Sequence, residues 1–122
     1  MTKISFKKFS KIDTEKFKSL NLEWLDRYFK VEPIDELVLN NPEREIVGKG
    51  GFIFMIQKNY NTIGTFAFIK KTEKIYEFSK MAIVPEERGN GYGNMAMAFL
   101  IEFAKNKKWS KLILYSNTKL KN

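Results

Sequence analysis

The chain has 122 residues, of which 43% are hydrophobic and 30% charged, and it contains neither cysteine nor histidine. This length and balance predict one globular domain over residues 1–122. The missing cysteine excludes disulfides, thiolate metal ligands and a cysteine acyl-enzyme, and with histidine also missing we expect no metal site. Acid-base chemistry would have to use carboxylates, tyrosine, lysine or water.

The formal net charge of +8 fits either a nucleic acid or a small polyanionic ligand. The lysines are dispersed along the sequence and no nucleic-acid-reading motif accompanies them, so we interpret the charge as a basic, solvated surface. A basic nucleic-acid-binding module stays as a third hypothesis. The sequence has no apolar run that could span a bilayer and no signal-peptide core, and we therefore expect a cytoplasmic location and no membrane partner.

The first half of the chain predicts one strand and two helices. Ile4–Phe9 alternates as a strand, and apolar residues recur every three or four positions from Thr14 to Phe29, which is the spacing of an amphipathic helix. A shorter helix over Ile34–Leu39 follows Glu32-Pro33. The segment Gly48-Lys49-Gly50-Gly51 predicts a loop.

The second half predicts mostly strands. The expected elements are strands at Phe52–Gln57, Thr62–Ile69 and Ile75–Val84, a helix that begins at Gly91 or Tyr92 and extends to about Lys105, and a last strand at Leu112–Tyr115. The turn-prone Asn59-Tyr60-Asn61 would close a hairpin between the first two strands. The predicted order is β-α-α-β-β-β-α-β, which is an α/β (α+β) fold class.

The loop Val84-Pro85-Glu86-Glu87-Arg88-Gly89-Asn90-Gly91-Tyr92-Gly93 joins the long strand to the apolar helix. Three glycines in five residues let the backbone turn tightly and approach a ligand without Cβ atoms in the way. A helix that starts directly after them directs its free N–H groups and positive dipole end at the same place. The loop therefore predicts a phosphate site, to which Arg88 adds a positive charge.

The spacing of these glycines excludes two common phosphate loops. The dinucleotide fingerprint G-x-G-x-x-G fails because Asn94 stands where the third glycine should be. The P-loop pattern G-x-x-x-x-G-K-[ST] occurs nowhere in the chain. What remains is R-x-x-G-x-G, from Arg88 to Gly93.

This motif after Met81-Ala82-Ile83-Val84-Pro85, with the strand, loop, helix and strand across residues 75–117, resembles the GNAT family of N-acetyltransferases. The upstream segments Asn21–Leu25, Val31–Asp35 and Gly50–Phe54 also resemble one bacterial subgroup. The resemblance implies a mixed, mostly antiparallel central sheet flanked by helices. It further implies transfer of acetyl from acetyl-CoA directly to a primary amine of a small molecule, peptide or protein.

The resemblance also implies which residues hold acetyl-CoA. The pantetheine arm would pair with the backbone of Met81, Ala82 and Ile83, and the pyrophosphate would lie on the amides of Arg88, Gly89, Asn90, Gly91, Tyr92 and Gly93. Asn117 is either a further CoA contact or a plain polar loop residue. The acceptor would lie against the first two helices, which carry Glu23, Trp24 and Asp35 among other acidic and aromatic residues.

Glu77 is the candidate general base. It lies on the long strand and, by alternation, is expected to share a face with Ser79 and Met81. A carboxylate in an otherwise apolar strand is costly to bury without a role or a partner. It matches the glutamate that some members of the family use as the base, directly or through water. The alternative is a structural ion pair, with Lys70 or Lys80 as its partner.

Members of the family usually continue after the last strand with a helix and two more strands, whereas this sequence ends at Asn122. The edge at Leu112–Tyr115 would then expose unpaired backbone and apolar side chains. A truncated chain, a segment from a partner or a homodimer would each account for it. The alternative function is therefore a CoA-binding domain with little or no catalysis.

Overall fold

The structure is a computed structural model that describes residues 3–28 and 30–114. Its single sheet has the order β1-β2-β3-β4-β5, with every neighbouring pair antiparallel except the parallel pair β4 and β5. The strands are β1 (Ile4–Lys8), β2 (Phe52–Lys58), β3 (Asn61–Lys70), β4 (Ile75–Ile83) and β5 (Lys111–Leu114). This mixed sheet confirms the predicted fold class.

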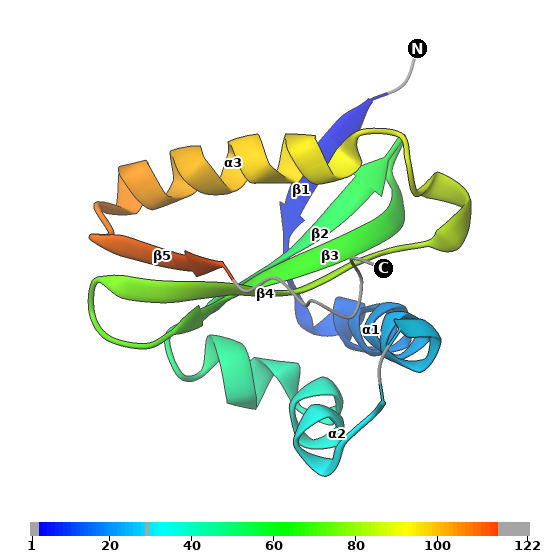
Figure 1. The fold of residues 1–122 in the computed structure, drawn as a ribbon, viewed down its shortest axis with the longest axis horizontal. Helices are drawn as coiled ribbons and strands as arrows, with labels where there is room; N and C mark the ends of the chain where they lie inside the picture. The colour runs from blue at the N-terminus through cyan, green and yellow to red at the C-terminus, as the bar shows by residue number, and fades with distance from the viewer. Residues whose placement is uncertain (1–2, 29, 115–122) are drawn as a thin grey trace.

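Helices cover both faces of the sheet, with α3 on one side and α1 and α2 on the other (Figure 1). The helices are α1 (Thr14–Tyr28), α2 (Pro33–Asn40) and α3 (Tyr92–Lys107). Three single turns accompany them, at η1 (Lys11–Asp13), η2 (Glu43–Val47) and η3 (Pro85–Glu87). The sequence predicted the three helices within one or two residues, but η2 was missed. None of the helices in the described ranges is long and apolar enough to cross a membrane.

Strand alternation divides the interior into two cores. The α3-side core is built around Phe54, Phe66, Phe68 and Tyr76 together with inward residues of α3. The α1-side core contains Phe17 and Leu20 of α1 with Ile53, Met55 and other residues from the opposite face of the same strands. Because successive residues of a strand point to opposite faces, one sheet can supply both cores.

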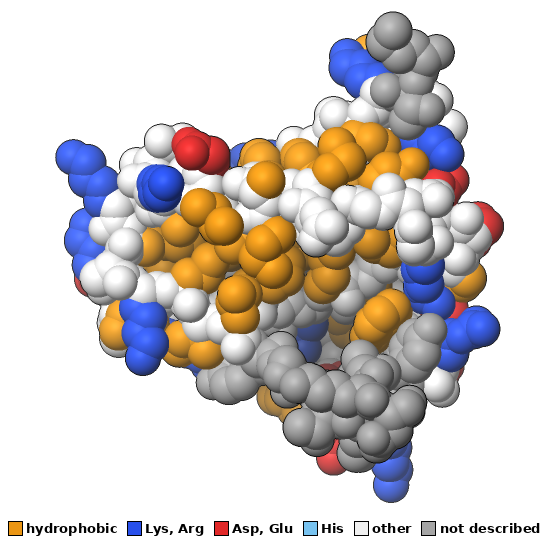
Figure 2. Space-filling view, turned by 45° about the horizontal axis from the view of Figure 1, so that its top comes forward, with side chains coloured by type: hydrophobic (Ala, Val, Ile, Leu, Met, Phe, Trp, Pro, Cys, Tyr) orange, Lys and Arg blue, Asp and Glu red, His pale blue; other side chains and the backbone are white. Residues whose placement is uncertain are grey.

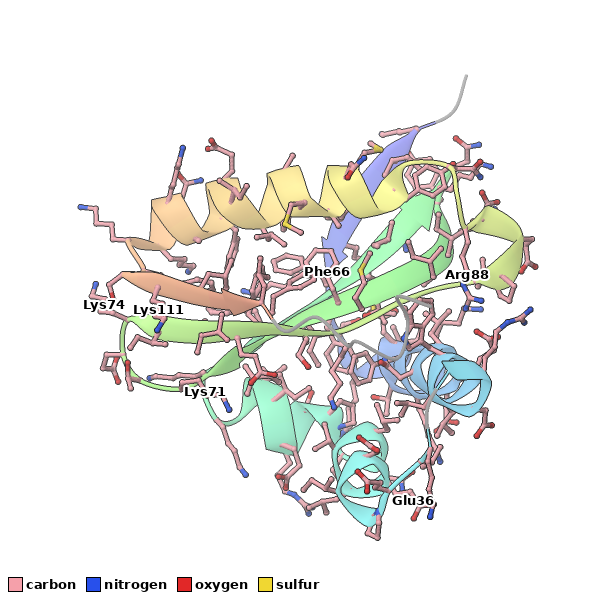
Figure 3. The ribbon with its side chains drawn as sticks, viewed as in Figure 1. Glu36, Phe66, Lys71, Lys74, Arg88 and Lys111 are labelled. Atoms are coloured by element: carbon pink, nitrogen blue, oxygen red, sulfur yellow. The ribbon has the colours of Figure 1, made fainter. Side chains whose placement is uncertain are left out.

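Phe66 lies at the centre of the α3-side core and is fully buried. Its ring lies within 6.0 Å, centroid to centroid, of the rings of Phe6, Phe54, Phe68, Phe78 and Phe99. Aromatic pairs at such separations add to the stabilisation that comes from area burial alone. Figure 3 shows Phe66 between α3 and the sheet.

A β-bulge interrupts β4 at Lys80, whose φ is +58°. Thr65 pairs with Ala82 and Ala67 pairs with Ser79, so two residues of β4 face one residue of β3. The extra residue reverses the alternation after it. Tyr76 and Phe78 before the bulge contact the α3-side core, as do Met81 and Ile83 after it. Glu77 therefore does not share a face with Met81, and that prediction was wrong because the bulge cannot be read from alternation.

The outer edge of β5 has no neighbouring strand among the described residues. Hydrophobic side chains are exposed beside it on the α3 side, as Figure 2 shows. Ile101 of α3 is 46% exposed and Leu114 of β5 is 50% exposed, whereas Leu112 packs against the α3-side core. Tyr115 lies outside the described residues, and a partner at this edge stays a prediction.

Replacing Phe66 by alanine should lower the free energy of unfolding by about 3–5 kcal/mol, because it leaves a cavity among five rings. Urea denaturation followed by circular dichroism measures the change. The control is Ile12→Ala, at a side chain that is 86% exposed, for which we expect a change within about 0.5 kcal/mol. Similar changes in the two variants would contradict this description of the core.

Candidate functional site

The loop from Val84 to Gly91 is fastened to β2 through Glu87. The carboxylate of Glu87 accepts hydrogen bonds from Lys58 Nζ at 3.1 and 3.2 Å and from Asn90 Nδ2 at 3.2 Å. The hydrogen bond to Glu87 raises the pKa of Lys58 above its ordinary value, and the Tyr92 hydroxyl adds to this effect. The loop thus has a defined shape in the free protein, and the Asn90 side chain helps to hold that shape.

The three glycines of the loop differ in their backbone conformation. Gly89 and Gly91 have φ values of +83° and +82°, in the left-handed region that other residues adopt at a cost. Gly93 has no such constraint. A Cβ atom added at any of the three would meet no heavy atom within 4 Å. The space in front of the loop is therefore open. At Gly93 neither the backbone conformation nor a neighbouring atom requires glycine.

The backbone amides of residues 89–94 belong to this loop and to the first turn of α3. Within the described part of the chain, none of these amides donates a hydrogen bond to another residue. The first hydrogen bond of the helix comes from the Met95 amide to the Gly91 carbonyl at 3.2 Å. The first turn of α3 contains no acidic residue, and Gly91 at its N-cap has no side chain to cap it. An anion placed here would be stabilised by the free N–H groups and by the helix dipole.

Half of one edge of β4 lies open beside the loop. β5 pairs with β4 only from Ile75 to Phe78, so within the described residues Ser79 to Ile83 have no strand on that side (Figure 1). The Val84 amide donates to the Ile63 carbonyl of β3 at 2.8 Å. Because main-chain groups alternate along a strand, those of Ala82 also face β3, whereas those of Met81 and Ile83 face the open edge. An extended ligand could pair with this edge.

The side chain of Arg88 points away from the open space in front of the loop. Arg88 Nε donates to the Ile83 carbonyl at 2.8 Å, and its Nη2 donates to Glu23 Oε1 of α1. The guanidinium also lies 4.8 Å from the centre of the Trp24 ring. Even the Arg88 amide is bonded, to the Pro85 carbonyl at 3.3 Å. Sequence reasoning gave Arg88 a phosphate-binding charge, and it missed Glu23 as the partner because the two residues are far apart in sequence.

Glu77 lies on the α1-side face of β4, where its neighbours across the two adjacent strands are Ile69 and Ile113. Its side chain is 16% exposed and forms an ion pair with Lys71 Nζ at 3.1 Å. Lys70 pairs with Glu73 instead, at 2.8 Å. Lys71 comes directly after β3 and follows Ile69 by two positions, and because Ile69 lies opposite Glu77, the register places Lys71 on the same face as Glu77.

The bulge places Lys80 on the helices that cover this face. Lys80 Nζ lies 3.9 Å from Asp35 Oδ1 at the start of α2, while Asp35 also accepts a hydrogen bond from the Glu32 amide at 3.0 Å. Two of the acidic residues expected on the acceptor side, Glu23 and Asp35, are therefore paired with basic residues of the loop and the strand. Asn117 lies outside the described residues. No group of side chains in the ranges 3–28 and 30–114 could hold a metal ion.

The family profile that matches this sequence is that of the Acetyltransferase (GNAT) family, over residues 17–122. No curated protein gives a significant match.

Solved structures of acetyltransferases have the same fold. A GNAT-family acetyltransferase from Staphylococcus aureus Mu50 matches with a TM-score of 0.82 and 18% identity, covering 97% of this chain and 76% of its own. A predicted acetyltransferase from Clostridium acetobutylicum, crystallised with acetyl-CoA, matches with a TM-score of 0.74 and 20% identity over 94% and 82% of the two chains. AAC(6')-Iy, in complex with the bisubstrate analogue CoA-S-monomethyl-acetylneamine, matches with a TM-score of 0.70 and 13% identity over 94% and 80%.

The two kinds of loop glycine should respond differently to alanine. Gly93→Ala should raise the free energy of unfolding by about 0.5 kcal/mol, because alanine favours the helix and its methyl group meets nothing. Gly91→Ala should lower it by about 1–2 kcal/mol because of the positive φ. Chemical denaturation of both variants checks this, and a loss of stability in Gly93→Ala would show that the space is not open.

Proposed function

Because the chain belongs to the GNAT acetyltransferase family, a family that uses acetyl-CoA, we propose that it transfers acetyl from acetyl-CoA directly to a primary amine. The acceptor would be an amine of a small molecule, a peptide or a protein. The single observation that carries the proposal is the row of free amides at residues 89–94 beside the open edge of β4. The amides suit a pyrophosphate, and the open edge suits an extended amide-containing arm.

The residues of this chain have distinct parts in the proposed reaction. The amides of Gly89 to Gly93 would bind the pyrophosphate. The main-chain groups of Met81 and the N–H of Ile83 would pair with the pantetheine arm, because the Ile83 carbonyl already accepts a hydrogen bond from Arg88 Nε. An N–H of this edge, that of Met81 rather than Ala82, would stabilise the oxyanion of the tetrahedral intermediate, because the Ala82 main chain faces β3. Acetyl-CoA supplies the activated thioester.

The attacking amine must lose a proton, since an alkyl ammonium has a pKa of about 10. Glu77 is our candidate to take it. Glu77 and Met81 are four positions apart along β4, which is at most about 13 Å of extended chain. The amine would therefore lie over Ser79 between them, or the proton would pass through water. Lys71 Nζ forms its ion pair with Oε1 of Glu77. The other carboxylate oxygen, Oε2, would therefore have to accept the proton.

A second function is favoured by the same ion pair. If Glu77 serves only as the partner of Lys71, the chain would bind CoA without efficient turnover. Two measurements on the wild-type chain separate the possibilities. Acetyl-CoA should raise the melting temperature in both cases, whereas release of free CoA thiol with a panel of amines should exceed background only if the chain is a transferase.

Filling the space in front of the loop should abolish binding of acetyl-CoA. We expect Gly93→Leu to remove the thermal shift, because the new side chain enters the open space while the backbone there remains ordinary. Gly91→Leu gives the same test, with added backbone strain from the φ of +82° at that position. Thermal denaturation with and without acetyl-CoA measures both variants, and Ile12→Ala is the control. A shift that survives in Gly93→Leu would mean that the phosphate site lies elsewhere.

Substituting Glu77 by glutamine should lower kcat/KM for the amine by about 100-fold or more, the usual contribution of a general base, and leave acetyl-CoA binding unchanged. The matched control is Lys71→Gln, which breaks the same ion pair but keeps the carboxylate. Steady-state release of CoA thiol gives both values. Equal losses in the two variants would identify the pair as structural.

A further inference from the structure

The side chain of Arg88 joins three parts of the molecule that are distant in sequence. Its Nε donates to the last carbonyl of β4, its Nη2 donates to Glu23, and its guanidinium covers the ring of Trp24. Glu23 and Trp24 belong to α1, whereas Arg88 follows η3 in the loop. Figure 3 shows Arg88 between the loop and α1. The side chain of Arg88 is 19% exposed and that of Glu23 is 38% exposed, so the guanidinium is the better shielded of the two groups.

The charge of Arg88 is already compensated. Its guanidinium contacts the carboxylate of Glu23, which also lies 3.7 Å from Arg27 Nη1 on the outer side of the helix. A phosphate at the loop would have to draw Arg88 away from Glu23, from the Ile83 carbonyl and from the Trp24 ring together. The free amides of residues 89–94 offer it donors at no such cost.

The contacts also fix where α1 lies. Leu20, Trp24 and Leu25 of α1 pack in the α1-side core with Ala82, one residue before the carbonyl that Arg88 holds. The guanidinium is a planar fork that can serve a carbonyl and a carboxylate at once, which a lysine could not do in the same geometry. The end of β4 and the middle of α1 are therefore held by packing on one face and by Arg88 at the edge.

We propose that Arg88 is a positioning residue, which sets the distance between α1 and the open edge of β4 instead of binding the pyrophosphate. Its link to acetyl-CoA and to the acceptor rests on the function proposed above. In that function α1 borders the acceptor and β4 borders the acyl donor. Arg88 and Glu23 thus determine how the two substrates face each other while the Arg88 side chain contacts neither.

The test compares Arg88→Gln, Glu23→Gln and the double variant with Arg27→Gln as the matched control. Arg27→Gln removes the same kind of charge from beside Glu23, at a side chain that is 57% exposed and follows Glu23 by one turn of α1. Hydrogen exchange of the α1 amides in the free protein should speed up about three- to tenfold in each single variant, as expected for a partly shielded charged hydrogen bond. The double variant should show no further increase, and the control should show none.

Ligand binding supplies the readout that a merely structural role would not change. In Arg88→Gln the salt dependence of the acetyl-CoA dissociation constant should equal that of wild type, because no phosphate contact is lost. With an amine that turns over, the amine KM should rise by a similar factor in Arg88→Gln and Glu23→Gln, and no further in the double variant. Arg88→Lys keeps the charge without the fork and should behave as Arg88→Gln, which covers the case where the glutamine variant folds poorly.

A weaker salt dependence in Arg88→Gln, with α1 exchange unchanged, would make Arg88 a phosphate ligand and overturn the proposal. Additive effects of the two single variants would overturn it as well. If wild-type protein does not bind acetyl-CoA, the proposed function fails, yet the exchange experiment still decides whether Arg88 positions α1.

Discussion

The one extra residue in β4 opposite Phe66 is the constraint on which the rest of the site depends. A strand that paired regularly with β3 along its whole length would keep Glu77 and Met81 on one face. The bulge at Lys80 changes the face at mid-strand and turns Met81 and Ile83 toward the α3-side core. It lies just beyond the end of the pairing with β5, so among the described residues the second half of β4 has an open edge that the first half lacks.

Main-chain groups and side chains have different roles at the proposed site. The groups directed at the proposed ligand are the amides of the loop and the free groups of the β4 edge. The polar side chains around them bind to other parts of the protein: Glu87 to Lys58, Asn90 to Glu87, and Arg88 to Glu23. These side chains fix the loop before a ligand arrives, and a site fixed in advance loses less conformational freedom on binding.

The sequence was sufficient for the elements and for the loop because both depend on local chemistry. Apolar spacing located α1 and α3, and the cluster of glycines located the turn that starts at Gly89. The bulge could not be predicted, because Lys80 is not a residue that favours a positive φ and the pairing with β3 forces it there. The η2 turn at Glu43–Val47 was missed although Pro42 and the acidic residues Glu43 and Glu45 mark its start, because five residues are too few to show an apolar period.

Side-chain contacts between residues that are distant in sequence were the other feature that the sequence did not predict. The contact of Arg88 with Glu23 spans 65 positions and exists only because α1 packs on β4. The choice of Lys71 over Lys70 as the partner of Glu77 also needed the register of β3 against β4, in which Ile69 lies opposite Glu77. The proposed roles of Met81, Ile83 and Glu77 depend on which way a strand faces, which the fold supplies and a single sequence does not.

A ligand site lined by backbone amides places few requirements on the identity of the side chains around it. Apart from the glycines, any residue has the same N–H group, so substitutions around the loop can accumulate while its shape is kept. The solved acetyltransferases share 13–20% of their residues with this chain and still superpose with TM-scores of 0.70–0.82. If the proposed donor site is of this kind, the helices on the opposite side of β4 are free to change their chemistry, and one scaffold can serve many acceptors.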